Sequence, residues 1–371
     1  MNSRIATAWL LLVLVAISGC GRDTIAPPAP VTRTVNFYNW TDDIGPGVIE
    51  AFEKETGIHV NVDYFDSYEM LETKLLTGHT EYDVVVVGGN VLERLTGLGV
   101  FLPLDRAQLP NWKNLDPDLM AKLAKHDPGN RYAIGYQWGT TGVGYNATRQ
   151  RELAPDAPTD SWRMIFDPAV VSKMAPCGVS MIEAPSEVVA SALVYLGRDP
   201  NSKAPEDMQA VEKLLAGIRP SIRKIDSDSQ ISEFASGDIC LMLTWGTNAT
   251  LARTRAREAG LAPDLRYVIP REGAISWFDT LAIPADSPHP AEAHLFIDYL
   301  MRPDVAAANA NYIQLPTMNK AALPLVSESL RNDPSIYPPP EIVAQLTPLL
   351  ARSQEQSRVD TRIWTRFKTG Q

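Results

Sequence analysis

The first third of the chain alternates short apolar runs with amphipathic stretches. The run from Thr34 to Tyr38 predicts a strand, and the stretch from Pro46 to Thr56, closed by Gly57, predicts a helix. A second strand is expected from His59 to Phe65. The apolar run from Tyr82 to Val87 suits a short buried strand of a parallel sheet. This alternation predicts a doubly wound α/β lobe.

A further helix is expected between the second and third strands. Asp66 and Glu69 have the spacing of a capping box and predict a helix that runs to Leu76. In doubly wound sheets, ligands bind beyond the carboxyl ends of the strands. The segments from Trp40 to Asp43 and from Gly88 to Asn90 both fall there. We therefore expect these two loops to be neighbours over one cleft.

The middle of the chain repeats this pattern. The stretch from Ser186 to Leu196 predicts a helix with Ser186 as its cap and Glu187 in its first turn. The apolar run from Ile239 to Thr244 predicts a strand that leads into Trp245. The glycine-rich segment 139–144 lacks the lysine of a Walker motif and the spacing of a dinucleotide fingerprint. We interpret it as an extended crossover between two lobes.

A late strand is expected from Ala274 to Ile283, where the chain returns to the first lobe. The predicted first lobe comprises residues 35–137 and about 262–313. The predicted second lobe comprises residues 138–261 and about 314–371. Two lobes joined by at least two crossovers indicate a hinged cleft.

The amino terminus predicts export. Arg4 precedes an apolar core from Ile5 to Ile17, which is too short for a comfortable membrane span. Small residues before Cys20 resemble a lipobox, which implies a signal peptide at residues 1–19 and acylation of Cys20; an ordinary secretory peptide with a chance cysteine is the alternative. Residues 20–34 are rich in proline and predict a tether between the lipid anchor and the folded domain.

Two cysteines remain after Cys20. An even pair in an oxidising compartment favours a disulfide between Cys177 and Cys240, although two buried free thiols are an alternative. The bridge would close a loop of about 60 residues and contribute about 3–4 kcal/mol. A metal site is not expected, because the five histidines are scattered and none is spaced with a cysteine as zinc requires.

The charge balance is acidic, with 44 Asp and Glu against 34 Lys and Arg and a formal net charge of −10. An acidic surface disfavours nucleic acid and mildly attracts cations.

A tryptophan stands two residues before an aspartate twice, at Trp40-Thr41-Asp42 and at Trp277-Phe278-Asp279. Side chains at i and i+2 share a face of an extended chain, so each site could offer an indole and a carboxylate to an organic ammonium group. A half-buried aromatic beside a solvated turn acid is the alternative.

Several long segments carry a family resemblance. They include FYNWTDDIGPGVIEAFEKETGIHV, YDVVVVGGNVLERL, ASGDICLMLTWG and VIPREGAISWFDTLAIPAD. From about Val35 to the carboxyl terminus, the chain resembles the polyamine-binding proteins of bacterial ABC importers and is most similar to the putrescine-binding branch. The resemblance implies a two-lobed periplasmic solute-binding protein that closes on putrescine or spermidine and delivers it to a membrane permease. We expect a monomer without a cofactor.

The resemblance also implies a set of ligand residues and the cysteine pair. The matching ligand positions are Trp40, Thr41, Asp42, Glu187, Trp245, Trp277 and Asp279. The chain departs from the branch at four positions, with Asp43 for a tyrosine, Gly88 for a serine, Asn248 for an aspartate and Leu315 for a tyrosine. These changes move negative charge within the cleft and leave the preferred polyamine open.

Other ligands and activities fit the sequence less well. Amino acids and phosphates need a basic partner, which the motif segments do not place next to these positions, and three acids without a basic partner argue against neutral sugars. A glycosidase needs two carboxyl groups about 5–10 Å apart, whereas the adjacent Asp42 and Asp43 should point in different directions. No catalytic residues are therefore assigned. A sensor that contacts a receptor would use the same fold and remains an alternative to transport.

Overall fold

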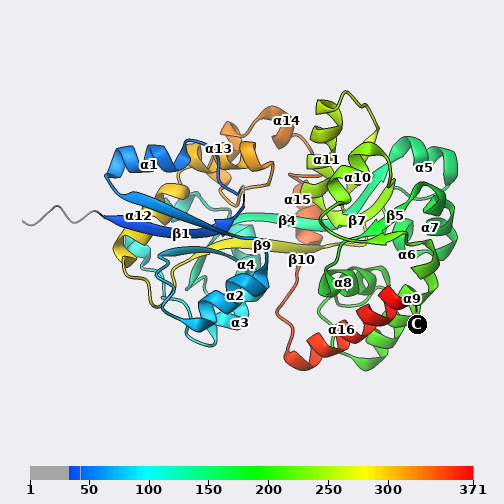
Figure 1. Ribbon diagram of the computed structural model, residues 1–371, viewed down its shortest axis with the longest axis horizontal. Coiled ribbons are helices and arrows are strands. Elements are labelled where there is room, and N and C mark those ends of the chain that lie inside the picture. The colour runs from blue at the N-terminus through cyan, green and yellow to red at the C-terminus, as the bar shows by residue number, and fades with distance from the viewer. Residues whose placement is uncertain (1–32, 42, 371) are drawn as a thin grey trace, which may run out of the picture. The chain divides into compact units, whose positions relative to one another are not determined.

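The computed structural model describes residues 33–41 and 43–370 (Figure 1). The expected signal peptide, the acylated Cys20, tether residues 20–32 and the candidate ligand residue Asp42 lie outside the described residues. Within the described part of the chain, no helix combines the length and apolarity that crossing a bilayer requires.

The first lobe is built on a mixed sheet. Strands β1 (Thr34–Trp40), β2 (His59–Phe65) and β3 (Val84–Gly88) are parallel, with β1 in the middle. Strand β9 (Ile275–Ala282) adds to β3 in the antiparallel direction. All four strands were expected from the sequence, and β1 extends two residues beyond its predicted end, to Trp40.

Helices cover both faces of this sheet. Along β3, Val85 and Val87 pack into one apolar cluster and Val84 and Val86 into another, and all four side chains are fully buried. A strand buried on both faces needs a continuous apolar run, which is the pattern that predicted it. The helices of this lobe are α1 (Val48–Thr56), α2 (Tyr68–Thr77), α3 (Gly89–Thr96), α4 (Pro117–Leu123), α12 (Pro290–Leu300) and α13 (Pro303–Ile313), with short 3-10 helices η1 (Arg106–Gln108) and η2 (Pro110–Asn114).

The predicted cap of α2 was wrong by one residue. Ser67, not Asp66, is the N-cap, and its side chain accepts a hydrogen bond from the backbone N–H of Met70 at 3.2 Å. Asp66 instead accepts a hydrogen bond from the Thr41 hydroxyl at 2.9 Å. Both residue types cap helices well, so the composition alone does not decide between neighbours.

Strand β4 (Ala133–Asn146) runs without interruption through both lobes (Figure 1). Its first half pairs with β9, and its second half pairs with β7 (Leu241–Trp245) and β8 (Leu265–Val268). The extended crossover expected at residues 139–144 is therefore confirmed.

The second lobe continues the sheet from β7. Strand β5 (Val179–Met181) is parallel to β7, and β6 (Lys224–Ile225) is parallel to β5. Helix α8 (Pro185–Tyr195) begins one residue before the predicted cap Ser186, because Pro185 occupies its first turn and Ala184 is the N-cap. The other helices here are α5 (Ala147–Leu153), α6 (Arg163–Phe166), α7 (Pro168–Met174), α9 (Pro205–Ile218), α10 (Gln230–Ser236), α11 (Gly246–Glu258) and α16 (Gln354–Thr369), with η3 (Ala175–Cys177) and η4 (Arg219–Ser221).

The lobe boundaries drawn from the sequence stay a prediction, and two segments favour moving them. Strand β8 pairs with the end of β4 that also pairs with β7, which places residues 265–268 with the second lobe. Asn319 forms a bridge with Leu115, and η5 (Lys320–Leu325) packs against α13, which places this segment with the first lobe. The remaining elements are α14 (Glu328–Arg331), α15 (Pro340–Gln345) and β10 (Thr347–Pro348), which pairs with β9.

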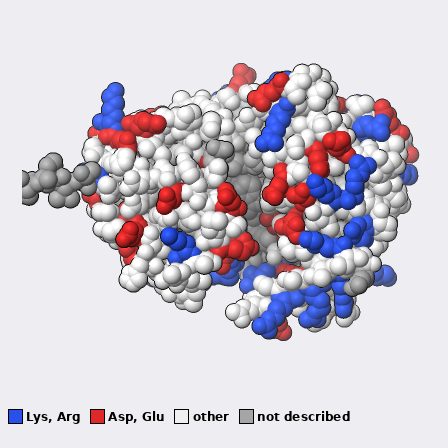
Figure 2. Space-filling view, in the orientation of Figure 1, with Lys and Arg blue, Asp and Glu red and all other residues white. Residues whose placement is uncertain are grey.

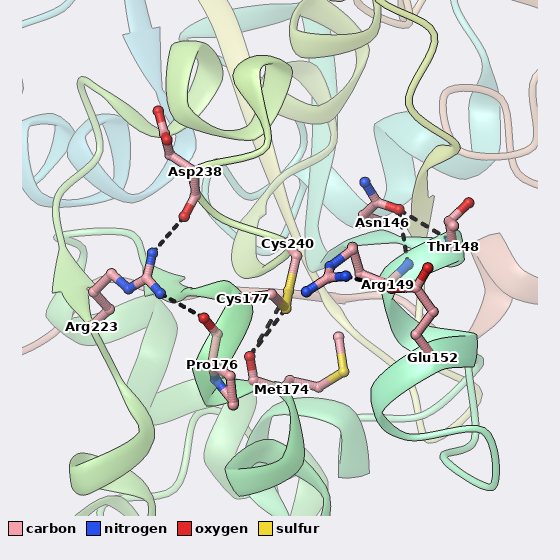
Figure 3. Close-up of a disulfide and its surroundings, with 10 residues drawn as sticks. All are labelled: Asn146, Thr148, Arg149, Glu152, Met174, Pro176, Cys177, Arg223, Asp238 and Cys240. Carbon is pink, nitrogen blue, oxygen red and sulfur yellow. Dashed lines mark hydrogen bonds and ion pairs between the residues drawn. A yellow bond between two sulfur atoms is a disulfide. The ribbon is translucent and has the colours of Figure 1, made fainter.

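A disulfide joins Cys177 and Cys240 (Figure 3). The two Cα atoms are 5.7 Å apart, and the residues are separated by 63 positions in the chain. Both side chains are buried, beside the carbonyl oxygen of Met174. The bridge ties the end of η3 to the start of β7, and it confirms the pairing expected from the sequence.

Candidate functional site

The second Trp-x-Asp motif lies on β9, where this strand meets both β3 and β4. Asp279 is paired with Gly88 of β3 and with Gln137 of β4, and Trp277 is paired with Gly139. Trp277 and Asp279 share a face of the strand because they are two residues apart. A Cβ atom at Gly139 would lie 2.6 Å from Cη2 of the Trp277 ring, so the indole lies directly across this glycine.

The loop after β1 brings Asp43 to the same place. The Tyr136 hydroxyl donates to the backbone oxygen of Asp43 at 3.2 Å, and Asn309 accepts from the backbone N–H of Gly45 at 2.8 Å. Asn309 also donates to the Tyr136 hydroxyl at 3.1 Å, so α13 and β4 hold the loop together. The carboxyl group of Asp43 is buried, and its Oδ2 has no hydrogen-bond partner among the described residues.

The second lobe contributes Glu187 and Trp245. Glu187 lies in the first turn of α8, where the helix dipole favours a negative charge. Its Oε2 accepts hydrogen bonds from the Trp245 indole N–H at 2.8 Å and from the Thr141 hydroxyl of β4. Trp245 is the last residue of β7 and is partly buried. Thr141 was not among the residues expected from the sequence.

Trp40 and Tyr68 complete the first-lobe side. The Trp40 ring stands at 76° to the Tyr68 ring, with the centroids 5.0 Å apart. The Tyr68 hydroxyl donates to Oδ1 of Asp279 at 3.3 Å. Sequence reasoning missed Tyr68, because a tyrosine at the start of an amphipathic helix gives no signal of its own.

For the remaining predicted residues, the structure records no hydrogen bond to the carboxyl groups of Asp43, Glu187 or Asp279 among the described residues. Thr41 is exposed, and its hydroxyl is directed to Asp66. Asn248 is buried in the first turns of α11, and its Nδ2 has no partner among the described residues. Leu315 is buried and shares a small crevice with Gly246. The role of these residues in contacting the ligand stays a prediction, as does that of the other site residues predicted from the sequence.

The three carboxyl groups of the cleft, Asp43, Glu187 and Asp279, share an unusual electrostatic environment. Burial raises the pKa of Asp279 to about 6, although the hydrogen bonds that its carboxylate accepts lower the pKa in part. Burial and the Asp279 charge raise the pKa of Asp43 well above its ordinary value, and burial raises the pKa of Glu187. Within residues 33–41 and 43–370, none of the three forms an ion pair with a lysine or arginine. An unbalanced buried carboxylate favours a cationic ligand.

The surface view agrees with this arrangement. Figure 2 shows the molecule hollowed between its two halves, with Asp and Glu side chains on both sides of the hollow. A groove of about 910 Å³ elsewhere is lined by Trp138, Tyr337 and Leu346 and includes none of the three carboxyl groups. We place the candidate site at the carboxyl groups, because they converge from both lobes and no lysine or arginine of the described residues forms an ion pair with them.

Replacing Asp279 by asparagine is expected to stabilise the ligand-free protein at neutral pH. The pKa of Asp279 is about 6 in the folded protein against an ordinary 3.8, so the folded state holds the proton more tightly than the unfolded state. The proton on Asp279 therefore stabilises the native fold fully below about pH 4, and this stabilisation is lost as the pH rises through about 6. The loss is at most about 3 kcal/mol. Asparagine resembles the protonated carboxyl group and does not suffer this loss.

Thermal unfolding of the native and Asp279→Asn proteins at pH 4 and pH 8 measures this effect. The advantage of the asparagine variant is expected to be larger at pH 8. A difference in melting temperature that does not change with pH would contradict the assignment of the raised pKa to Asp279.

Comparison with known proteins identifies the family. The family model for bacterial extracellular solute-binding proteins matches residues 47–338. The chain belongs to this family. The curated relatives that this chain matches are solute-binding proteins and not enzymes.

Two curated relatives are similar to this chain over nearly its whole length. It is 45% identical to the putrescine-binding periplasmic protein PotF of Escherichia coli, over 91% of this chain and 92% of that protein. It is 44% identical to a putrescine/agmatine-binding protein of Pseudomonas aeruginosa, over 94% of this chain and 95% of the relative. The resemblance to polyamine-binding proteins drawn from the sequence is thereby confirmed.

A solved structure supports the fold. The spermidine/putrescine ABC transporter substrate-binding protein PotD of Streptococcus pneumoniae superposes with a TM-score of 0.82 at 26% identity, over 91% of this chain and 99% of that one. The two-lobed α/β fold expected for this solute-binding protein is therefore confirmed.

Proposed function

We propose that this protein captures a polyamine in the periplasm, putrescine first and spermidine next, and delivers it to the permease of an ABC importer. One observation carries the proposal: Asp43, Glu187 and Asp279 are brought together from distant parts of the chain without a basic partner among the described residues. Taking carboxylates out of water is costly unless a positive charge balances them. A polyamine supplies that charge.

The positions of the carboxyl groups along β4 suit a ligand with two separated charges. Asp279 is paired with Gln137, whereas Glu187 accepts a hydrogen bond from Thr141, four residues further along the same strand. Four residues of a β-strand span about 13 Å. A flexible chain with an ammonium group at each end can therefore reach one carboxylate in each lobe.

Three tryptophans supply the apolar part of the site. Trp40, Trp245 and Trp277 are all partly buried and lie beside these carboxyl groups. Indole faces accommodate methylene groups, and each cation–π contact contributes about 0.5–2 kcal/mol. Asp42, which the resemblance places in the ligand set, belongs to this proposal as a further anion.

The cellular setting is part of the same proposal. The relatives include a protein described as periplasmic, and the leader of this chain has the features of a lipoprotein signal. We place the mature domain in the periplasm as a monomer, attached to the membrane through acylated Cys20 and the tether. A receptor for another organic cation, or a polyamine sensor, would use the same site and is the second candidate.

A calorimetric panel tests the proposal. Purified mature domain is titrated with putrescine, cadaverine, spermidine, spermine and agmatine at neutral pH. Saturable binding is expected for putrescine and spermidine, with putrescine tighter. Absence of binding for both would overturn the proposal, and tighter binding of agmatine would favour another organic cation.

A further inference from the structure

Gly88 makes room for a tyrosine inside the cleft. A Cβ atom at position 88 would lie 2.7 Å from Cζ of Tyr68 and closer still to its hydroxyl oxygen. The backbone of Gly88 has φ −67°, which any residue can adopt. Space, and not backbone conformation, is therefore what requires a glycine here. The carboxyl end of β3 is shaped around the Tyr68 side chain.

Tyr68 is held at both of its ends. It is the first residue of α2, its ring packs edge-on against Trp40, and its hydroxyl donates to Asp279. Burial, followed by the charge of Asp279, raises the pKa of this hydroxyl well above its ordinary value, so it remains a donor at all physiological pH values. The side chain is nevertheless only partly buried, so part of it remains accessible.

We propose that Tyr68 is a specificity-determining residue, which closes the cleft beyond Asp279 and so selects a short diamine over a longer triamine. The inference rests on the proposed function and concerns the length of the polyamine. A primary ammonium has three N–H donors, so it can donate to Asp279 and to the free lone pair of the Tyr68 oxygen at once. The ring fills the space that a longer amine would need to extend past this carboxylate.

Two substitutions separate the hydroxyl from the ring. Tyr68→Phe keeps the ring and removes one acceptor, so the affinity for putrescine is expected to fall about fivefold while the ratio of spermidine to putrescine affinity stays the same. Tyr68→Ala removes the wall, so that ratio is expected to rise about tenfold or more. Titration calorimetry with both amines measures the four constants.

Gly88→Ala tests the packing that positions Tyr68. The new methyl group displaces the tyrosine, so this variant is expected to shift the ratio in the same direction as Tyr68→Ala. In the Tyr68→Ala background, Gly88→Ala is expected to change the ratio less than twofold, because nothing remains to be displaced. Tyr82→Phe is the matched control, since it removes another tyrosine hydroxyl bonded to an aspartate, Asp63, at 2.9 Å.

The outcomes distinguish this inference from the proposed function. If the native protein binds neither amine, the proposed function fails and the inference fails with it. If the native protein binds putrescine but Tyr68→Ala leaves the ratio unchanged, the inference alone is overturned. Should the alanine variant not fold, a Gly88→Ala protein that binds both amines with the native ratio would also overturn it.

Discussion

Alanine at position 279 is expected to weaken putrescine binding about a hundredfold or more. Asp279 is only 7% exposed, and sheet pairing with Gly88 and Gln137 fixes its position. Removing one partner of a buried charge pair costs about 2–5 kcal/mol, which is about thirtyfold to several thousandfold in affinity. Titration calorimetry at pH 7.5 or above measures the loss with the carboxylate ionised.

Two companion variants make this result specific. Asp279→Asn keeps the shape of the side chain and removes the charge, so a loss similar to that of alanine shows that the charge carries the binding. Asp63→Ala removes another aspartate of the same lobe that accepts a tyrosine hydroxyl, and it is expected to leave the affinity unchanged. An Asp279→Ala protein that binds putrescine within threefold of the native affinity would contradict the assignment of this residue to the site.

Loss of the disulfide is expected to lower the free energy of unfolding by about 3–4 kcal/mol. The bridge closes a loop across 63 positions, so it restricts a large part of the unfolded chain. The affinity for putrescine is expected to survive, because Cys240 precedes the first residue of β7 whereas Trp245 is its last. Five residues of a strand separate the bridge from the site by about 17 Å.

Denaturant unfolding of the Cys177→Ala, Cys240→Ala double variant measures this loss. Both positions are replaced so that neither cysteine of the bridge is left as an unpaired thiol, and the native protein with reductant serves as a second form of the same test. A decrease of less than about 1 kcal/mol would show that the bridge does not restrict the unfolded state as the loop model requires. A large loss of putrescine affinity in a folded double variant would show that the bridge positions the site.

The parts of the fold that follow from local patterns could be predicted. The apolar runs that became β3 and β9 needed only composition and length, because strands buried on both faces leave little choice of residue. Strands β1 and β2 are partly exposed, and β2 was predicted from its alternating apolar and polar residues. The cap of α2 was misplaced by one residue and that of α8 by two, since neighbouring Ser, Asp and Pro residues compete for the same turn. Such shifts do not alter the architecture.

The site was predictable only where its residues carry their own signal. Trp277 and Asp279 stand out as a motif, and their convergence with Glu187 rests on the resemblance. Tyr68 is separated from Asp279 by 211 positions, and nothing in its surroundings marks it. The glycine at position 88 was noted as a departure, but its meaning depends on the tyrosine opposite, which only the three-dimensional structure shows.

Strand β4 belongs to both lobes, and this sharing limits which changes evolution can make to the protein. Its first half completes the sheet that contains β9, and its second half is the partner of β7 and β8. Neither lobe is therefore a module that a gene fusion could exchange for a foreign counterpart, since the transfer would cut the strand and open the edge of both sheets. Substitutions at the cleft, such as those proposed at Tyr68 and Gly88, leave β4 intact, so we expect ligand preference to change through them and not through recombination of whole lobes.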